Sequence, residues 1–176
     1  MPLTSLFRRR ADAATIHALY GAIVLAARAP EFYECWGVPD TLDGRFELIA
    51  LHAFLVLRRL NREPETSFFS QGLFDVMFAD FDRNLREMGA SDLGVGRQVK
   101  EMAKSFYGRV RAYERGLQGD EALDQALRRN LFGTAKPSPA QVEGVAAYLR
   151  RQAATLDAAP AAALLRGELP LGRMEA

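Results

Sequence analysis

The sequence is poor in the residues that build metal sites and covalent cross-links. Its 176 residues include one cysteine and two histidines, His17 and His52. A single cysteine excludes an intrachain disulfide and any zinc site built from several cysteines. Of the 23 basic residues only three are lysines, and the net charge is +1. That balance argues against a strongly basic DNA-binding protein, so no DNA partner is predicted.

Familiar catalytic motifs are missing as well. The chain has no glycine-rich phosphate loop, no GxGxxG after a strand, and no HExxH, CxxC or GxSxG pattern. The two histidines fall in different apolar stretches, where a structural role is the ordinary one. Cys35 lies beside Glu31 and Glu34 rather than in an electropositive setting, so it is interpreted as a packed thiol. The sequence therefore predicts no catalytic, cofactor-binding or metal-binding residue, and a protein that is not an enzyme.

Long hydrophobic runs are absent, and no stretch of about 20 apolar residues predicts a transmembrane helix. The arginines at 8–10 and the apolar stretch after them resemble a secretory signal. Asp12, His17 and Tyr20 interrupt that stretch, so we do not expect export.

Apolar residues recur at helical spacing, and no stretch alternates with the period of a strand. The predicted helices span 12–28, 40–61, 67–88, 94–115, 120–131 and 138–156. They predict an all-α, single-domain bundle of about six helices, with a flexible N-terminus over 1–11, a helical domain over 12–157 and an Ala/Pro-rich tail over 158–176. The loop at 29–40 carries Phe32, Tyr33, Cys35 and Trp36, which we expect to plug one end of the bundle.

The second predicted helix is apolar nearly all round. Besides the apolar residues of its main face, this helix carries apolar residues on its other sides: Leu48, Leu51, Phe54 and Leu55. Such a helix is either central to the core or leaves an apolar face open for a partner. The central position is favoured because large exposed apolar patches are uncommon on monomers. These four residues are nevertheless candidate partner-binding residues.

The fourth predicted helix carries positive charge along one side. At 100° per residue a basic face lies opposite the apolar stripe, formed by Arg97, Lys100, Lys104, Arg111 and Arg115. A solvated surface is the ordinary interpretation; the functional ones are an anionic membrane surface, RNA or the ribosome, or an acidic protein. Tyr107 lies to the side and Tyr113 on the core face, so no aromatic stacking platform is predicted beside it.

Several segments resemble, in order and spacing, the ubiquinol–cytochrome c chaperone family. They are 37–41 (GVPDT) with 44–47 (GRFE); 73–78 (LFDVMF), Asp82 and 85–89 (LREMG); and 92–96 (DLGVG), Val99, Lys100, Met102 and 106–109 (FYGR). The resemblance covers about 14–131, and the tail beyond Pro137 matches nothing specific.

The resemblance implies an all-α assembly chaperone for the cytochrome b–c complex (complex III), without catalytic residues or cofactors. Mitochondrial members are expected to pair with a small partner, lie near the ribosome exit and hold newly made cytochrome b. For this chain it implies a bacterial-type member that binds cytochrome b or another complex III subunit through a groove of the second and third helices. The expected location is cytoplasmic, or peripheral at the inner face of the plasma membrane.

Two alternatives remain open. One is a peripheral membrane- or ribosome-binding helical module, in which the basic face is the function. The other is a helical enzyme with a ligand pocket near Phe32, Tyr33, Cys35, Trp36 and His52, which a filled pocket would exclude.

Overall fold

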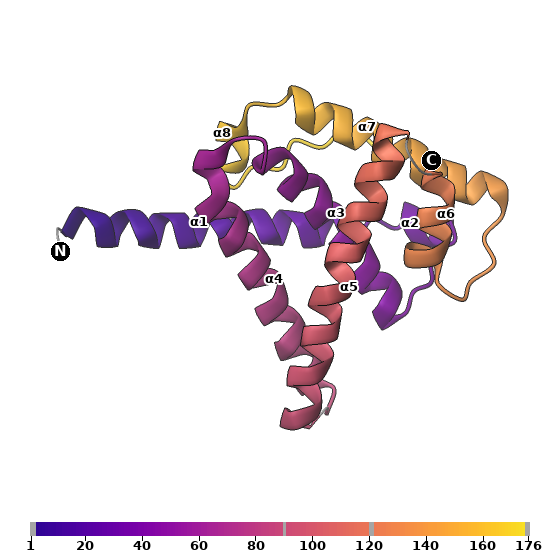
Figure 1. Cartoon of the computed structure of the whole chain (residues 1–176), viewed down its shortest axis with the longest axis horizontal. Coiled ribbons are helices and arrows are strands. Elements are labelled where there is room, and N and C mark those ends of the chain that lie inside the picture. The colour runs from indigo at the N-terminus through magenta and orange to yellow at the C-terminus, as the bar shows by residue number, and fades with distance from the viewer. Residues whose placement is uncertain (1–2, 90, 120–121, 175–176) are drawn as a thin grey trace.

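The computed structural model describes residues 3–89, 91–119 and 122–174 as helices joined by short loops (Figure 1). In chain order the elements are α1 (Leu3–Ala27), α2 (Glu31–Glu34), α3 (Leu42–Leu60), the 3₁₀ turn η1 (Pro64–Thr66), α4 (Ser67–Glu87), α5 (Asp92–Gln118), α6 (Leu123–Leu127), the π-helix η2 (Arg128–Phe132), α7 (Pro139–Ala158) and α8 (Ala161–Leu164). No strand occurs in these residues. The predicted all-α bundle is confirmed.

Helix starts follow the capping residues that the sequence offers. The Thr41 hydroxyl accepts a hydrogen bond from the Gly44 amide at 3.1 Å and caps α3. Ser138 and Gln141 form a reciprocal capping box at the start of α7, with Pro139 in its first turn. These two helices begin where the sequence predicts them.

Three other boundaries differ from the prediction. Helix α1 already begins at Leu3, so most of the segment expected to be a flexible N-terminus has a helical backbone. Helix α5 passes through Gly116, where a Cβ would lie only 3.0 Å from the Leu123 Cα, and ends at Gly119 with φ of 84°. Gly116 therefore permits the close approach of α6 instead of ending the helix. The single helix predicted over 120–131 is α6 followed by the π-helix η2.

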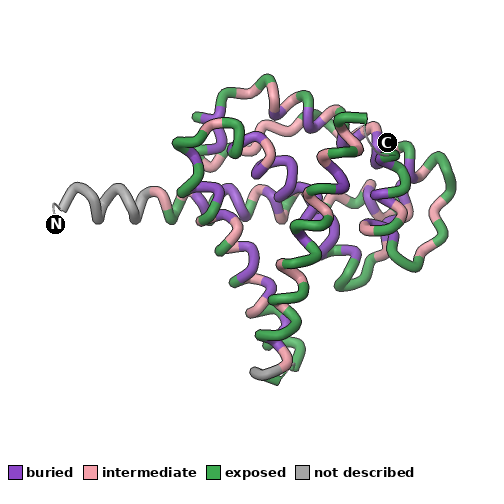
Figure 2. The backbone as a smooth tube through the Cα atoms, in the orientation of Figure 1, coloured by how far each residue is buried: buried purple, intermediate pink, exposed green. Residues whose placement is uncertain are grey.

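Helix α3 is the centre of the fold. Helices α1, α4, α5 and α7 all contact it, and Figure 2 shows buried residues gathered in the middle of the molecule. All four side chains predicted as a possible open face, Leu48, Leu51, Phe54 and Leu55, are at most 1% exposed. The favoured interpretation of a central core helix is confirmed, and the alternative of an accessible apolar face at these four residues is wrong because neighbouring helices cover α3 where they lie.

Two long helices extend away from this centre as a hairpin. Helices α4 and α5 are antiparallel and pack along each other, and they are connected at the narrow tip seen in Figure 1. Aromatic contacts hold them together, including Phe78 with Phe106 at 6.1 Å between ring centroids. The hairpin exposes the outer side of α5 along most of its length (Figure 2).

The C-terminal tail is docked rather than loose. The buried Gln152 amide donates to the Gly172 carbonyl at 3.2 Å and accepts from the Gly172 N–H at 2.7 Å. Leu164 is fully buried, and Leu169, Leu171 and Met174 pack against the core. The expected short helix near 161–166 is present as α8, while the expectation of frayed final residues fails for those described to Met174.

The segment Asp12–Glu34 is long and apolar enough to cross a membrane, although no membrane-spanning helix was predicted from the sequence. Core helices of soluble proteins and signal sequences meet the same criterion. In this structure Ile16, Leu19 and Ile23 of that segment are buried, and α1 packs on α3 and α4.

Candidate functional site

A groove of about 830 Å³ opens where four elements meet. Its walls come from the start of α3, the end of α4, the first two turns and middle of α5, and η2 with the residues that follow it. We call it the signature groove, because its lining draws on segments that carry the family resemblance: 39–47, 85–88 and Met102 with Arg109.

The edge formed by α3 depends on a glycine. A Cβ on Gly44 would lie 2.0 Å from the Pro39 carbonyl oxygen, a separation that no side chain tolerates. Because Gly44 has no side chain, the loop 37–41 can pack closely against the first turn of α3, which Thr41 caps. The GVPDT and GRFE segments are thus one structural unit that shapes the mouth of the groove.

A buried ion pair lies on the groove floor. Arg109 of α5 donates from Nε and Nη2 to both carboxylate oxygens of Glu47 on α3, 62 residues away in sequence. The guanidinium carbon also lies 5.5 Å from the centroid of the Phe46 ring, which packs on Phe81. Burial raises the pKa of Glu47 above its ordinary value, against the opposing effect of Arg109.

Two buried polar groups stand near this pair without a partner. Among the described residues, neither the Tyr113 hydroxyl nor the Asn130 amide nitrogen makes a hydrogen bond. Burial raises the pKa of Tyr113, with a further contribution from the charge of Glu47. Asn130 belongs to η2, and π-helical segments are frequent at functional sites. Asn130 lines the groove and adds a polar group to it, whereas Tyr113 is fully buried and lies outside the lining.

The rim of the groove is open and mixed: beside exposed polar and charged residues such as Arg45, Asn84 and Glu87 it carries two large apolar side chains. Met88 is 60% exposed and Leu42 is 46% exposed, while Met102 and Leu85 line the interior. Methionine fills irregular space and adapts to different contacts. Leu42 and Met88 therefore give a mostly polar rim two exposed apolar contacts for a bound segment.

The region proposed for an enzyme pocket is filled around Phe32, Trp36 and His52, whereas Tyr33, also named for it, lines the signature groove. His52 is buried; its Nδ1 donates to the Leu48 carbonyl at 2.7 Å, since that carbonyl can only accept, and its Nε2 accepts from the Tyr148 hydroxyl at 2.8 Å. The Phe32 ring packs edge-on against Trp36, His52 and Tyr148. Burial lowers the pKa of His52 to about 4, so the ring stays neutral.

This cluster, which we call the aromatic plug, confirms the predicted plugging role of Phe32 and Trp36. Cys35 is exposed, so its interpretation as a packed thiol is wrong. His17, expected among apolar neighbours, is also exposed. In the described part of the chain no group of three His, Cys, Asp or Glu side chains could hold a metal ion.

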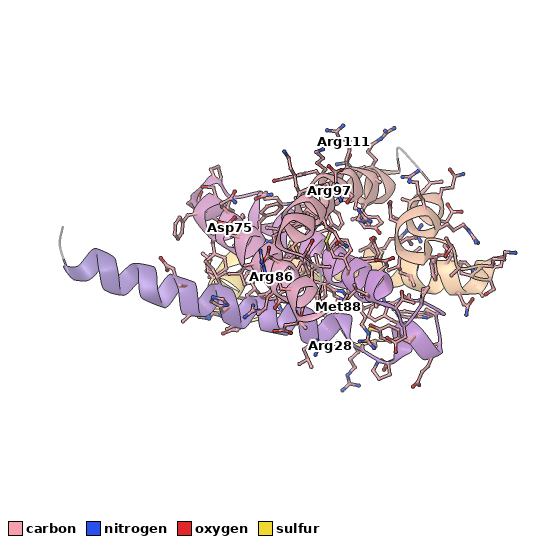
Figure 3. The ribbon with its side chains drawn as sticks, turned by 90° about the horizontal axis from the view of Figure 1, so that it is seen from below. Arg28, Asp75, Arg86, Met88, Arg97 and Arg111 are labelled. Atoms are coloured by element: carbon pink, nitrogen blue, oxygen red, sulfur yellow. The ribbon has the colours of Figure 1, made fainter. Side chains whose placement is uncertain are left out.

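The basic face is a surface, as its spacing predicts. Its five residues, Arg97, Lys100, Lys104, Arg111 and Arg115, are all exposed. Lys104 pairs with Glu101 at 2.8 Å, both well exposed. Figure 3 places Arg97 and Arg111 on one side of the molecule and Met88 and Arg28 on the other. The basic face and the signature groove therefore lie on different sides of the molecule.

Sequence reasoning missed the ion pair on the groove floor. Glu47 and Arg109 each end a segment of the family resemblance, GRFE and FYGR, but the two segments are far apart in the chain. The signal available in the sequence was that the two segments end in residues of opposite charge. The sequence also left Tyr107 aside, although it is 61% exposed and stacked on Phe74.

Comparison with known proteins identifies the family and a structure of the same fold. The sequence model of the family described as ubiquinol-cytochrome C chaperone matches residues 34–171, which reaches well into the tail that the resemblance left unmatched and starts later than its expected beginning. The crystal structure of the Cbp3 homolog from Brucella abortus is 36% identical, with a TM-score of 0.84 over 98% of both chains.

Several curated relatives are named as assembly factors of ubiquinol–cytochrome c reductase. Ubiquinol-cytochrome-c reductase complex assembly factor 1 of Xenopus laevis is 28% identical over 72% of this chain and 64% of its own length. The mouse protein of that name is 28% identical over 79% of this chain and 48% of its own length, and yeast mitochondrial protein CBP3 is 29% identical over 73% and 40%. The chain thus spans between 40% and 64% of the length of these relatives. By the extent of the family match and the likeness of the whole fold, this chain belongs to the ubiquinol–cytochrome c chaperone family.

Proposed function

We propose that this chain is a non-enzymatic assembly chaperone for the cytochrome b–c complex, complex III. Its signature groove holds a segment of newly made cytochrome b or of another subunit of that complex. The observation that carries the proposal is the meeting of three signature segments, from α3, α4 and α5, at this one groove. The names of the relatives, complex assembly factors, support the same role.

The groove has the chemistry that holding an apolar segment needs. Leu42 and Met88 offer exposed apolar surface at the rim, and burial of such surface stabilises a complex by roughly 25 cal/mol per Å² before the costs of association. Recognition of an apolar helix by an apolar groove is a recurring mode. The Glu47–Arg109 pair braces α3 against α5, so the groove keeps its width without a bound client.

The test uses membranes from the source cell and reduced-minus-oxidised spectra. Deletion of the protein is expected to remove the cytochrome signals of complex III while other respiratory complexes stay intact. The double variant Leu42→Asp, Met88→Asp is expected to reproduce that loss, because two carboxylates would replace the two exposed apolar side chains of the rim. Leu25→Asp, on the exposed side of α1, is the matched control and should leave the spectra normal.

Normal complex III in the deletion strain would overturn the chaperone role. Loss in the deletion strain with normal spectra in the double variant would retain the role and remove the groove from it.

The basic face supports a second candidate activity, contact with an anionic membrane surface or the ribosome. Its five exposed cations extend along the outer side of α5. Such contacts are worth roughly 1 kcal/mol per cation near an anionic leaflet and weaken with salt. We place the protein in the cytoplasm, with peripheral attachment at the inner face of the plasma membrane.

Sedimentation with phosphatidylglycerol vesicles and with ribosomes, across salt concentrations, tests this second activity. Reversing Arg97, Lys100 and Lys104 to Glu should abolish sedimentation while the fold remains intact. Unchanged sedimentation would remove the basic face from the proposal.

A further inference from the structure

A second cleft, of about 470 Å³, lies at the other end of α3 and shares no lining residue with the signature groove. It opens between the last turns of α3, the first turns of α4 and the second half of α5. Five of its lining side chains are apolar, Phe54, Leu57, Phe74, Phe106 and Val110, and polar or charged residues form much of the remainder. We call it the aromatic cleft.

A polar group inside this cleft has no partner. Ser70 is 7% exposed and lines the cleft, and its hydroxyl makes no hydrogen bond within the described residues. A serine in a helix can donate back to the carbonyl four residues earlier, which here belongs to Thr66, but this hydroxyl does not do so. A buried hydroxyl left unpaired is unfavourable, so an occupant with a polar tip would gain by pairing with it.

An exposed aromatic ring forms one lip of the cleft. Tyr107 is 61% exposed and stacks on Phe74, with 5.6 Å between ring centroids and 29° between planes. Large exposed aromatic surface beside a cleft is typical of an anchor site for a partner side chain. Tyrosine and tryptophan dominate such anchors because each combines a large apolar body with a hydrogen-bonding tip.

The surface beside Tyr107 is positively charged. Lys104 and Arg111 lie three residues before it and four after it on α5, which makes them its helical neighbours. Arg62, 47% exposed at its side chain, adds a cation at the α3 side of the cleft. Ion pairs within the chain involve both signs here: Glu114 pairs with Arg58, Lys104 with Glu101 and Arg62 with Asp157. Arg111, exposed on the same side of α5, is therefore the first cation that a carboxylate on a partner would meet.

We propose that the aromatic cleft is a docking site for an acidic protein segment that inserts a tyrosine or tryptophan side chain. The ring lies in the cleft against Phe74 and Tyr107, its polar tip pairs with the Ser70 hydroxyl, and flanking carboxylates face Arg111 and Lys104. This surface is separate from the signature groove, so it stands or falls independently of the proposed client.

The test follows backbone amide shifts of the full-length protein by NMR during titration with three capped tripeptides. Ac-Glu-Tyr-Glu-NH₂ should shift Ser70, Phe74 and Tyr107. Ac-Glu-Phe-Glu-NH₂ should bind about fivefold more weakly, the worth of one hydrogen bond. Ac-Lys-Tyr-Lys-NH₂ should bind at least about threefold more weakly at low salt, a difference that shrinks as salt rises.

Variants assign these differences to named groups. Ser70→Ala should remove the preference for tyrosine over phenylalanine and keep the preference for Glu flanks. Lys104→Glu with Arg111→Glu should reverse the flank preference, whereas Arg150→Glu, an exposed charge reversal on α7, should change neither. Equal binding of the three tripeptides, or shifts confined to the signature groove, would overturn the proposal.

Two further arms separate other kinds of partner. Phosphatidylglycerol vesicles and a uridylate 12-mer are added to the same sample. If either perturbs the amides along α5 while no tripeptide shifts Ser70 or Phe74, this face binds a lipid surface or RNA instead, and the proposal fails.

Discussion

Two buried polar side chains of α3, five residues apart, have opposite surroundings. His52 lies in the aromatic plug, where both ring nitrogens are bonded and aromatic rings fill the space around it. Glu47 lies on the floor of an open groove, paired with an arginine from another helix. His52 therefore serves the packing of the core, whereas Glu47 lies where a bound segment could reach it.

The largest expected effect breaks the Glu47–Arg109 pair. Arg109→Met leaves a buried carboxylate unpaired and should lower the free energy of unfolding by about 3–5 kcal/mol, measured by urea denaturation at pH 7.5. The double variant Glu47→Leu, Arg109→Met should recover most of that loss, because no unpaired charge remains. A double variant as unstable as the single one would contradict this account of the floor.

The next effect concerns the mouth of the groove. Gly44→Ala forces a methyl group against the Pro39 carbonyl and should cost about 3 kcal/mol of unfolding free energy, near the upper end for overpacking. Gly96→Ala is the matched control, since nothing lies within 4 Å of its Cβ position. In a helix that change should stabilise the protein by about 0.5–1 kcal/mol. Equal effects of the two variants would contradict the close contact at Gly44.

The aromatic plug predicts a pH dependence of stability. Because the pKa of His52 is lowered to about 4 in the folded chain, the unfolded chain binds more protons below its ordinary pKa of 6.5. Stability therefore falls as the pH drops, by about 2 kcal/mol between pH 7.5 and pH 5 from this group. Glu47 acts in the opposite sense, since its raised pKa makes protonation favour the folded state.

Urea denaturation across that pH range measures the effect. His52→Gln should flatten the dependence, whereas His17→Gln, an exposed position, should leave it unchanged. An equal slope in both variants would mean that His52 is not the group responsible.

The smallest expected effect comes from the basic face. Reversing Arg97, Lys100 and Lys104 to Glu should change the free energy of unfolding by less than about 1 kcal/mol in total, because exposed charges contribute little. Urea denaturation beside the sedimentation assay checks this. A large loss of stability would show that the face is structural and would make the binding result uninterpretable as a surface effect.

Most of the helices, and the starts of two of them, could be predicted from the sequence alone. Periodic apolar residues placed α3, α4 and α7, and Thr41 and Ser138 marked where two of them begin, because spacing and capping act within a few residues. The sequence also carried the family resemblance and the exposure of the basic face. These features are local, so a linear reading can reach them.

Only the tertiary structure decided which apolar surfaces are free and which charges meet. Leu48, Leu51, Phe54 and Leu55 are covered because four helices surround α3. The ion pair on the groove floor joins residues 62 positions apart, and the partner of His52 lies 96 positions away on α7. Contacts at such separations depend on how helices pack, and helical periodicity fixes the face of each helix without fixing its neighbour.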